Sequence, residues 1–457
     1  MRSLYTVILL FCGELQAQWW QDAGLPLNQA YGVSEIYEDT TTNTLYCAGA
    51  LEHVVVPGYQ TFHYCTYQNG VWNRSVPFNN NVFTVINYHD TLVVGGVFTQ
   101  VDGQPIQYIA AFYDGTWHSF GNMSSTVRAL RFLDGELYAL GAFTYADGQW
   151  CRGVAKRVNG GWENVGYLDT YQGIVGDAVI FDGKLVVSGT IFVNGEDYAH
   201  ILQYDGISWE SVGPGILGAI AGGGPLAVYQ GDLYVAGVIP VNAGNAGHGI
   251  MRWDGSMFHP VGTGFQDYTG GQGFTLAVRG LVVKDDLLFA CGGFGFAGNV
   301  PAPSQVATWD GERWCPLKGS LDPNSVAFGL GFFGDTLFVG GGQVADGQPV
   351  NRLVRFIGDT YSDTCSIPMG PMAVLDPPVS RTSTILDMGG GTYLLRGGRS
   401  GEGAPLVIHT ISGQIVHVKD ARFGPDGTVS FQLNGLAPAT YIVGLGAFRA
   451  KLVVAAP

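Results

Sequence analysis

The sequence predicts an all-β protein, a seven-bladed β-propeller followed by a small C-terminal β-sandwich. Two phrases recur in phase along the chain. One places an aromatic residue just after a turn, as in FYDGTWHSFG, and the other is an apolar run stopped by glycine, as in LVVGG. A self-similar unit of about 45–50 residues, repeated around a ring, is typical of propeller blades. After the last copy the repeat stops and short alternating strands of another kind begin.

Residues 1–17 are predicted to be a secretory signal peptide. Arg2 supplies the positive start, residues 4–12 form a short apolar run, and Ala17 offers a small residue for cleavage. A membrane-spanning helix needs about 18 or more apolar residues, so this run is too short for an anchor. No other apolar run of that length occurs, and no membrane span is expected.

Two landmarks mark each blade. The second strand of each blade is expected at the apolar runs 45–49, 92–96, 137–141, 185–189, 233–237, 287–293 and 337–341. The outermost strand is expected at the aromatic landmark, which falls at Trp72, Trp117, Trp162, Trp209, Phe258, Trp314 and Tyr361. Aromatic and β-branched residues favour strands, and the glycines that end the apolar runs let neighbouring backbones approach closely.

Residues 82–121 illustrate how one copy forms four strands. The segments VFTVINY, TLVVGGVF, YIAAFY and TWHSFG are separated by turn or loop residues, and Asp114-Gly115 joins the last two. Asp-Gly is a strong hairpin signal because both central residues take positive φ angles. The complete set of blades is expected to occupy residues 18–365.

Residues 19–24 read WWQDAG and repeat the outer-strand phrase ahead of the first blade. We predict that this strand completes the last blade and so fastens the N-terminal end of the ring to its C-terminal end. A strand around Tyr361 is the competing candidate for the same place. Closure matters because an open ring would expose the edge of a sheet.

The segment after the repeat divides into a linker and a second domain. Residues 366–379 hold four prolines and are expected to form the linker. Residues 380–457 contain short strands, and in TVSFQLNGL the apolar residues alternate with polar ones, which indicates one buried face. A small sandwich is the expected structure of this domain.

The repeat resembles that of kelch-like propellers, including the galactose-oxidase-like group. It shares the glycine pair after the second strand, as at 95–96, 292–293 and 340–341, and a Tyr-to-Trp spacing across the last two strands, as from Tyr113 to Trp117. The arginine that kelch repeats carry after the last strand is missing. Galactose-oxidase-like enzymes hold copper with paired histidines and tyrosines, and no histidines here pair at ligand spacing, so no cofactor or metal is expected.

Residues 380–457 resemble the C-terminal sorting domain of the type IX secretion system. The matching stretches are LVIHTISGQIVHV (406–418), LNGLAPATYIVGL (433–445) and the closing AKLVV (450–454). The Tyr-Pro-Asn-Pro opening of that family is absent. The resemblance implies transit through the periplasm, passage across the outer membrane by the type IX machinery, and a final location in the medium or on the outer cell surface.

The charge and the cysteines limit the partners. The formal net charge is −15 with only 22 Lys and Arg, and no basic cluster occurs, so no nucleic-acid partner is expected. We expect a monomer. Six cysteines follow the signal peptide, and Cys47 and Cys65 fall on consecutive predicted strands of one sheet, which makes them the disulfide candidate. The alternative is that most of the cysteines are buried free thiols.

The most distinctive polar feature is a repeated loop between the second and third strands of a blade. It reads VDGQP, ADGQW or ADGQP, and such loops should line one face of the ring. Their acidic and amide side chains could bind sugar hydroxyls or a cation, although Asp-Gly also recurs simply as turn chemistry. The candidate ligand-binding residues are Asp102, Gln104, Asp147, Gln149, Asp346 and Gln348.

Three functions fit these observations. A non-catalytic secreted or surface propeller that binds a glycan or a protein is favoured, because the repeated loops are nearly identical and no catalytic motif is found. The alternatives are an enzyme that acts on extracellular polysaccharide at the ring mouth, and a structural surface component. The sequence leaves enzymatic activity open and assigns no catalytic residue, since propellers host all three kinds of function.

Overall fold

The computed structural model describes most of the ring and the strands of the C-terminal domain. In the ring it covers residues 18–25, 29–53, 60–61, 63–166, 168, 173–193, 197–198, 200–217, 222–267, 276–322, 325–358, 360–361 and 365. In the C-terminal domain it covers residues 384–389, 392–396, 403–410, 415–422, 428–432, 439–445 and 448–454. The predicted signal peptide (1–17) and linker (366–379) lie outside these ranges.

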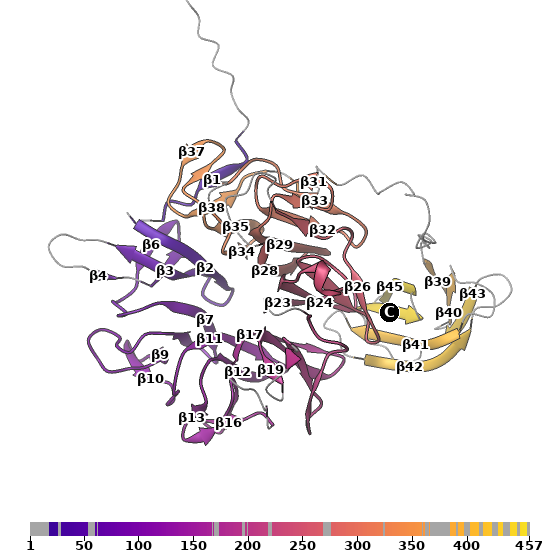
Figure 1. Ribbon diagram of the computed structural model, residues 1–457, viewed down its shortest axis with the longest axis horizontal. Coiled ribbons are helices and arrows are strands. Elements are labelled where there is room, and N and C mark those ends of the chain that lie inside the picture. The colour runs from indigo at the N-terminus through magenta and orange to yellow at the C-terminus, as the bar shows by residue number, and fades with distance from the viewer. Residues whose placement is uncertain are drawn as a thin grey trace, which may run out of the picture.

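Seven antiparallel sheets follow one another along the chain, and each forms a blade (Figure 1). Blades 1 to 3 are β2 (Gln29–Asp39), β3 (Thr44–His53), β5 (Tyr64–Gln68), β6 (Val71–Arg74); β7 (Val82–Tyr88), β8 (Thr91–Gly96), β9 (Ile109–Tyr113), β10 (Thr116–Ser119); and β11 (Val127–Leu133), β12 (Glu136–Gly141), β15 (Val154–Val158), β16 (Gly161–Asn164). Blades 4 and 5 are β17 (Ile174–Phe181), β18 (Lys184–Thr190), β21 (Ile201–Tyr204), β22 (Trp209–Ser211); and β23 (Gly222–Tyr229), β24 (Asp232–Val238), β25 (Ile250–Trp253), β26 (Phe258–Pro260). Blades 6 and 7 are β28 (Ala277–Lys284), β29 (Leu287–Gly293), β32 (Val306–Trp309), β33 (Trp314–Pro316); and β34 (Gly329–Phe333), β35 (Thr336–Gly340), β38 (Leu353–Phe356), β1 (Trp20–Asp22).

Short accessory strands decorate the loops of the ring. They are β4 (Gln60–Thr61), β13 (Tyr145–Ala146), β14 (Gln149–Trp150), β19 (Phe192–Val193), β20 (Asp197–Tyr198), β27 (Phe265–Gln266), β30 (Phe296–Ala297), β31 (Val300–Pro301), β36 (Val344–Ala345) and β37 (Gln348–Pro349), with one 3-10 turn at Val241–Ala243. Among the described residues, no helix is long and apolar enough to cross a membrane.

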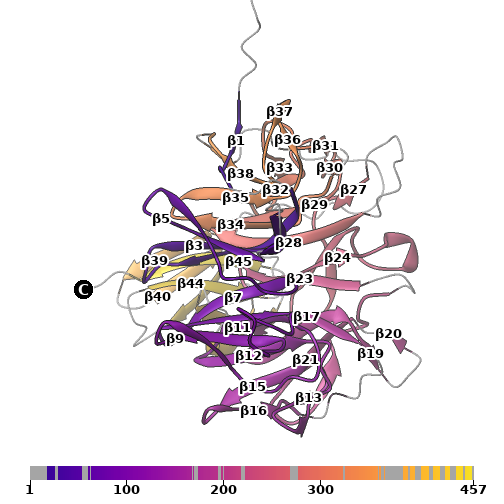
Figure 2. The same ribbon diagram turned by 90° about the vertical axis from the view of Figure 1, so that its left-hand side faces the viewer.

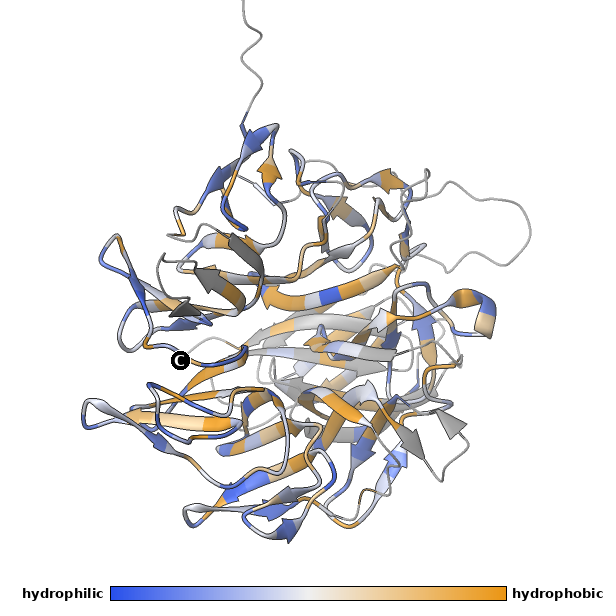
Figure 3. Cartoon of the chain, turned by 60° about the vertical axis from the view of Figure 1, so that its left-hand side comes forward, coloured by the Kyte–Doolittle hydropathy of each residue, from blue (hydrophilic) through white to orange (hydrophobic). Residues whose placement is uncertain are grey.

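The hydrophobic core of the ring lies between the sheets. Seven clusters of buried side chains each combine two consecutive blades, and one of them joins blade 7 to blade 1 through Phe338 and Val33. Strands β2 and β34 are also in contact, so the ring is closed. Apolar residues accordingly make up much of the inner strands, while hydrophilic residues are frequent in the outer hairpins (Figure 3). No blade could bury both of its faces alone, which is why the unit is repeated.

The N-terminal strand closes the ring as predicted. Strand β1 pairs antiparallel with β38, so that Trp20 lies opposite Phe356 and Asp22 lies opposite Val354. Figures 1 and 2 both show β1 beside β38, at the top of the molecule. Tyr361 is not part of a strand; its ring packs on Phe356 instead. The last blade is therefore built from both ends of the propeller segment.

In five blades a tryptophan of the outermost strand is hydrogen-bonded to the preceding blade. The indole Nε1 of Trp162 in blade 3 donates to the carbonyl oxygen of Phe120 at the end of blade 2, at 2.8 Å. Gly121 follows that carbonyl, and a Cβ atom added there would lie 2.4 Å from the Trp162 ring. The Trp-to-Gly spacing thus places a glycine under the indole of the next blade. Equivalent indole bonds link Trp209 to Val165, Trp314 to Val261, Trp20 to Lys318 and Trp72 to Ala23.

The cysteine prediction was wrong. Cys47 and Cys65 are opposite each other on β3 and β5, but both are free thiols, fully buried in the cluster between blades 7 and 1. They act there as small apolar side chains, and burial raises the pKa of the Cys65 thiol to about 12. The disulfide of the described residues joins Cys315 in β33 to Cys365.

The C-terminal strands form two sheets that share a core, as predicted. One sheet contains β39 (Thr384–Gly389), β40 (Thr392–Arg396) and β43 (Thr428–Gln432); the other contains β41 (Gly403–Thr410), β42 (Ile415–Arg422), β44 (Ala439–Leu445) and β45 (Phe448–Val454). Leu395 and Phe431 from the first sheet cluster with Ile408 and Val443 from the second. This is a small sandwich.

Candidate ligand site at the ring axis

The repeated polar loops are held against the outer strands of their blades. In blade 3 the carboxylate of Asp147 accepts backbone N–H groups from Asn122 at 2.7 Å and Trp162 at 2.8 Å. In blade 7 the carboxylate of Asp346 accepts N–H groups from Trp20 at 2.8 Å and Ser320 at 2.8 Å. Both carboxylates therefore fasten a turn, and this favours the structural interpretation of the recurring Asp-Gly.

The other loop candidates do not converge on one site. The backbone N–H of Asp102 donates to Pro77 at 2.9 Å, and Gln104, Gln149 and Gln348 are exposed. The short hairpin of β13 and β14 contacts outer strand β16, which is three strands from the innermost strand β11. At about 4.8 Å per strand this is roughly 15 Å from the innermost strand. The structure therefore spreads the candidates around the rim.

A β-bulge marks the innermost strand of most blades. In blade 3, Val127 pairs with Gly141 and Ala129 pairs with Leu140, so Arg128 is the extra residue. A Cβ atom on Gly141 would lie 2.1 Å from the Thr126 carbonyl oxygen, so the glycine permits the close approach on which the bulge depends. The corresponding extra residues in blades 1, 2, 4, 5 and 6 are Ser34, Phe83, Gly176, Pro225 with Gly224, and Arg279.

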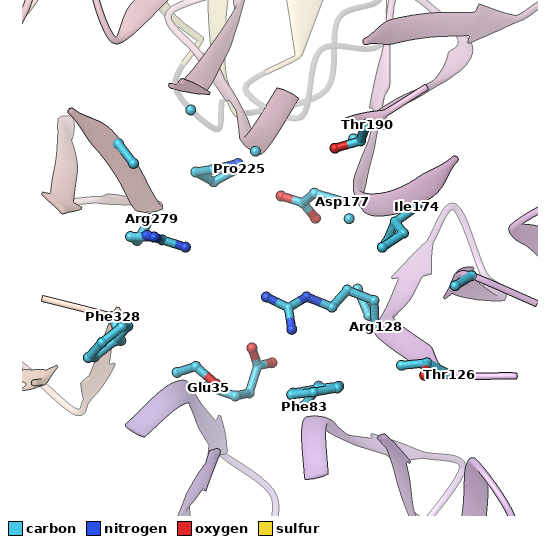
Figure 4. Close-up of a pocket in the computed structure, with 18 of the residues that line it drawn as sticks. Glu35, Phe83, Thr126, Arg128, Ile174, Asp177, Thr190, Pro225, Arg279 and Phe328 are labelled. Atoms are coloured by element: carbon cyan, nitrogen blue, oxygen red, sulfur yellow. The ribbon is translucent and has the colours of Figure 1, made fainter. Parts of the chain in front are cut away.

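These bulge residues line a cavity of about 670 Å³ at the axis of the ring. Bulges commonly re-aim a side chain next to a functional site. Figure 4 shows Arg128, Arg279 and Phe83 pointing into the same open space as Glu35 and Asp177, which are the residues next to the bulges of blades 1 and 4. A few polar groups converging in a cavity of this size are typical of a ligand site.

Asp177 serves the scaffold. Its carboxylate accepts the Nε–H of Arg131 at 2.7 Å and the backbone N–H groups of Ala178 and Leu226, both at 2.9 Å. These bonds join blade 3 to blade 4 and blade 4 to blade 5. The hydroxyl of Thr84 in blade 2 accepts the N–H of Leu130 in blade 3 at 3.1 Å and so joins these two blades.

Glu35, Arg128 and Arg279 are charged groups of the cavity for which the described residues provide no hydrogen bond. Glu35 is half-buried and protein surrounds it, and this desolvation raises the pKa of its carboxyl to about 7 against the attraction of Arg131. Arg128 is exposed to the cavity, but the protein around its guanidinium reduces its solvation, and this effect, and after it the positive charge of Arg279, lowers the pKa of Arg128. Arg128 lies over the Phe83 ring at 4.6 Å. These three groups are therefore available to a ligand.

Sequence reasoning missed the axis, although a signal existed. When the innermost strands are superposed on their valine, as in VSEI, VFTV, VRAL, VGDA and VRGL, the next two positions vary most. They carry Ser-Glu, Phe-Thr, Arg-Ala, Gly-Asp and Arg-Gly, while the flanking apolar positions repeat. These variable positions include residues that line the cavity, such as Glu35, Arg128 and Arg279.

One group of potential metal ligands is found among the described residues. It comprises Asp310, Cys315 and Cys365, and the two cysteines are joined in the disulfide, so their sulfurs are not thiolate ligands. The axial cavity holds one glutamate and one aspartate, and Asp177 is already committed to Arg131 and backbone N–H groups.

Comparisons with known proteins give no family for the chain. No family model matches it, and no curated protein matches it. Among solved structures, the computationally designed Ika8 protein matches with 13% identity and a TM-score of 0.39, over 74% of this chain and 99% of that one. The structure of YjhT matches with 14% identity and a TM-score of 0.35, over 64% of this chain and 99% of that one.

Proposed function

We propose that this protein is a secreted or surface-exposed binding protein whose ring mouth takes a glycan or a protein segment without catalysing its conversion. The observation that carries the proposal is the axial cavity of about 670 Å³, in which Glu35, Arg128 and Arg279 face open space without a hydrogen bond from the described residues. Arg128 and Arg279 are exposed and Glu35 is half-buried, so all three side chains can contact a ligand that enters the cavity.

A glycan-array screen with the full chain tests this function. Gly176 lies at the cavity wall, and a Cβ atom there would have its nearest contact at 3.8 Å, so Gly176→Trp can fill the cavity without distorting the backbone. Ile207→Trp is the matched control, because Ile207 is 87% exposed on an outer hairpin. Binding that survives Ile207→Trp and is lost in Gly176→Trp supports the proposal. Equal binding by both variants contradicts it.

The proposed route of export depends on the two ends of the chain. The signal-like segment 1–17 and the resemblance of residues 380–457 to a sorting domain support passage through the type IX system. In a host that carries this system, a truncation after residue 370 should leave folded propeller in the periplasm. A reporter fused between residues 1–25 and 370–457 should reach the surface or medium. Normal secretion of the truncated chain would show that the sorting assignment is wrong.

A second candidate function is hydrolysis of polysaccharide at the same mouth. The observation that favours it is the pKa of Glu35, which at about 7 suits a general acid or base at neutral pH. Incubation with extracellular polysaccharides should then release reducing ends, and Glu35→Gln should abolish the release. Retention of substrate binding without product release would return the site to the binding function.

A further inference from the structure

We infer that the axial cavity recognises an acidic sugar by its anionic group, a carboxylate or a sulfate, held between Arg128 of blade 3 and Arg279 of blade 6. The inference rests on the proposed function and names the class of ligand for that site. It goes beyond a general glycan or protein partner because it requires a negative charge at one position of the ligand. It is carried by the positions of the two arginines, by the hydrogen bonds that occupy the acidic groups around them, and by the apolar residues of the cavity wall.

The two arginines occupy equivalent bulges on opposite sides of the ring. Blades 3 and 6 are as far apart as a seven-membered ring allows, and Figure 4 shows both side chains directed toward the space between them. The positive charge of Arg279 contributes to lowering the pKa of Arg128, so each arginine lies in the field of the other. Two guanidinium groups that repel each other across a cavity form a ready site for an anion.

The acidic groups of the cavity do not neutralise this pair. Asp177 is occupied by Arg131 and by backbone N–H groups. Glu35 is attracted first to Arg131 and only more weakly to Arg128, and its carboxyl is partly protonated at neutral pH. The axis is therefore positive although the whole chain carries a net charge of −15. The charge at the axis is thus opposite in sign to the net charge of the chain.

The walls of the cavity suit a sugar ring better than a free inorganic ion. Phe83 lies beneath the guanidinium of Arg128 at 4.6 Å, which holds that group flat. Phe328, Ile174 and Pro225 add apolar surface around the same space (Figure 4). A cavity with apolar faces and a few charged groups at its centre matches a ligand that has apolar C–H faces and one charge.

Isothermal titration of the full chain with matched sugars tests the inference. Glucuronate and glucose, and galacturonate and galactose, are pairs that differ in the carboxylate, while glucose 6-sulfate and inorganic sulfate distinguish the sulfated sugar from the bare ion. We expect the acidic sugars to bind at least about tenfold tighter than the neutral ones, as expected for charged hydrogen bonds. Binding should strengthen as the pH falls from 8 to 6, because Glu35, which faces Arg131, Arg128 and Asp177, loses its negative charge.

Arginine variants connect this selectivity to the two residues. Arg128→Gln and Arg279→Gln should each weaken binding of the acidic sugar by about tenfold to a hundredfold. Neither variant should change binding of the neutral sugar. Arg313→Gln is the matched control, because it makes the same change on an outer hairpin, where Arg313 pairs with Asp310. Arg128→Lys keeps the charge and should retain part of the affinity, which separates loss of recognition from loss of folding.

The outcomes separate this inference from the proposed function. Equal affinity for acidic and neutral sugars, or unchanged affinity in both arginine variants, overturns the inference while cavity binding on the array still stands. Tight binding of inorganic sulfate with no preference for either acidic sugar also overturns it, because the site is then one for a free anion. Loss of array binding in the Ile207→Trp control as well as in Gly176→Trp would count against the proposed function.

Discussion

Replacement of Trp20 by alanine should open the ring at its seam. Trp20 is fully buried, its indole Nε1 donates to the Lys318 carbonyl oxygen at 2.9 Å, and its ring packs edge-on against Phe356 with centroids 5.0 Å apart. Truncation of a buried tryptophan costs about 3–5 kcal/mol. We expect the upper part of this range, because the hydrogen bond and the aromatic pair are lost together. Strand β1 is three residues long, and its other attachments are backbone bonds to β38 and to Asp346 and the bond from Arg355 to Gln21.

Trp162→Ala provides the matched control for this prediction. Trp162 is 1% exposed and makes the same kind of indole bond, to Phe120 at 2.8 Å, but the strand that carries it is continuous with the rest of its blade. Both variants should lower the free energy of unfolding by a similar amount in urea titrations. Only Trp20→Ala should make residues 18–25 rapidly exchanging in hydrogen-exchange measurements and open to proteases.

Two results would refute this reasoning. A loss of less than about 1 kcal/mol in Trp20→Ala would mean that the buried indole contributes far less than its packing implies. Full protection of the β1 amides in that variant would mean that the backbone bonds of β1, to β38 and to Asp346, hold the seam by themselves.

Three further predictions follow from the fold. Gly121→Ala should lower the free energy of unfolding by about 2 kcal/mol or more, because the new Cβ would lie 2.4 Å from the Trp162 indole. Gly115→Ala, also at positive φ but with nothing within 4 Å, should cost about 1 kcal/mol, and equal losses would contradict the steric argument. Burial lowers the pKa of His63 to about 4 from 6.5, so the unfolded chain binds the proton more readily than the folded one, and about 3 kcal/mol of stability should be lost as the pH falls from 6.5 to 4. The variant His63→Gln should flatten this part of the plot of unfolding free energy against pH, and an unchanged slope would contradict the assignment to His63. The double variant Cys315→Ser, Cys365→Ser opens a loop of 50 residues, and its free energy of unfolding should be about 4 kcal/mol lower than that of the oxidised parent protein. The fully reduced parent protein should match the variant, and equal stability of the oxidised parent and the variant would argue against the disulfide.

The architecture could be predicted because one physical constraint is repeated in most blades. An aromatic ring of the outer strand packs on a glycine of the preceding blade, so residues such as Trp162 and Gly121 recur at similar spacing. The same phrase at residues 19–24 allowed the closing strand to be recognised. Sequence repetition reports the contacts that all blades share, and those contacts determine the fold.

The candidate site could not be reached in the same way. Arg128 and Arg279 lie at bulge positions where each blade differs, so no repeat marks them. The loop residue Asp147 does recur, but its carboxylate is occupied by backbone N–H groups, so recurrence there reported turn chemistry. The disulfide partner of Cys315 could not be predicted either, because Cys365 lies beyond the last blade and its position depends on the closed ring.

The disulfide determines where a pull on the C-terminal end of the chain is felt. Strand β1 enters the seam at Trp20 and β38 leaves it at Phe356, directly opposite, so opposed forces on these two ends would peel the pair apart one residue at a time. Cys365 interrupts that path because it is tied to β33 in blade 6. Tension that arrives from residues beyond 365 therefore passes through the disulfide into blade 6 rather than directly into the pairing of β1 with β38. The disulfide therefore protects the pairing of β1 with β38 from a force applied to the C-terminal end of the chain.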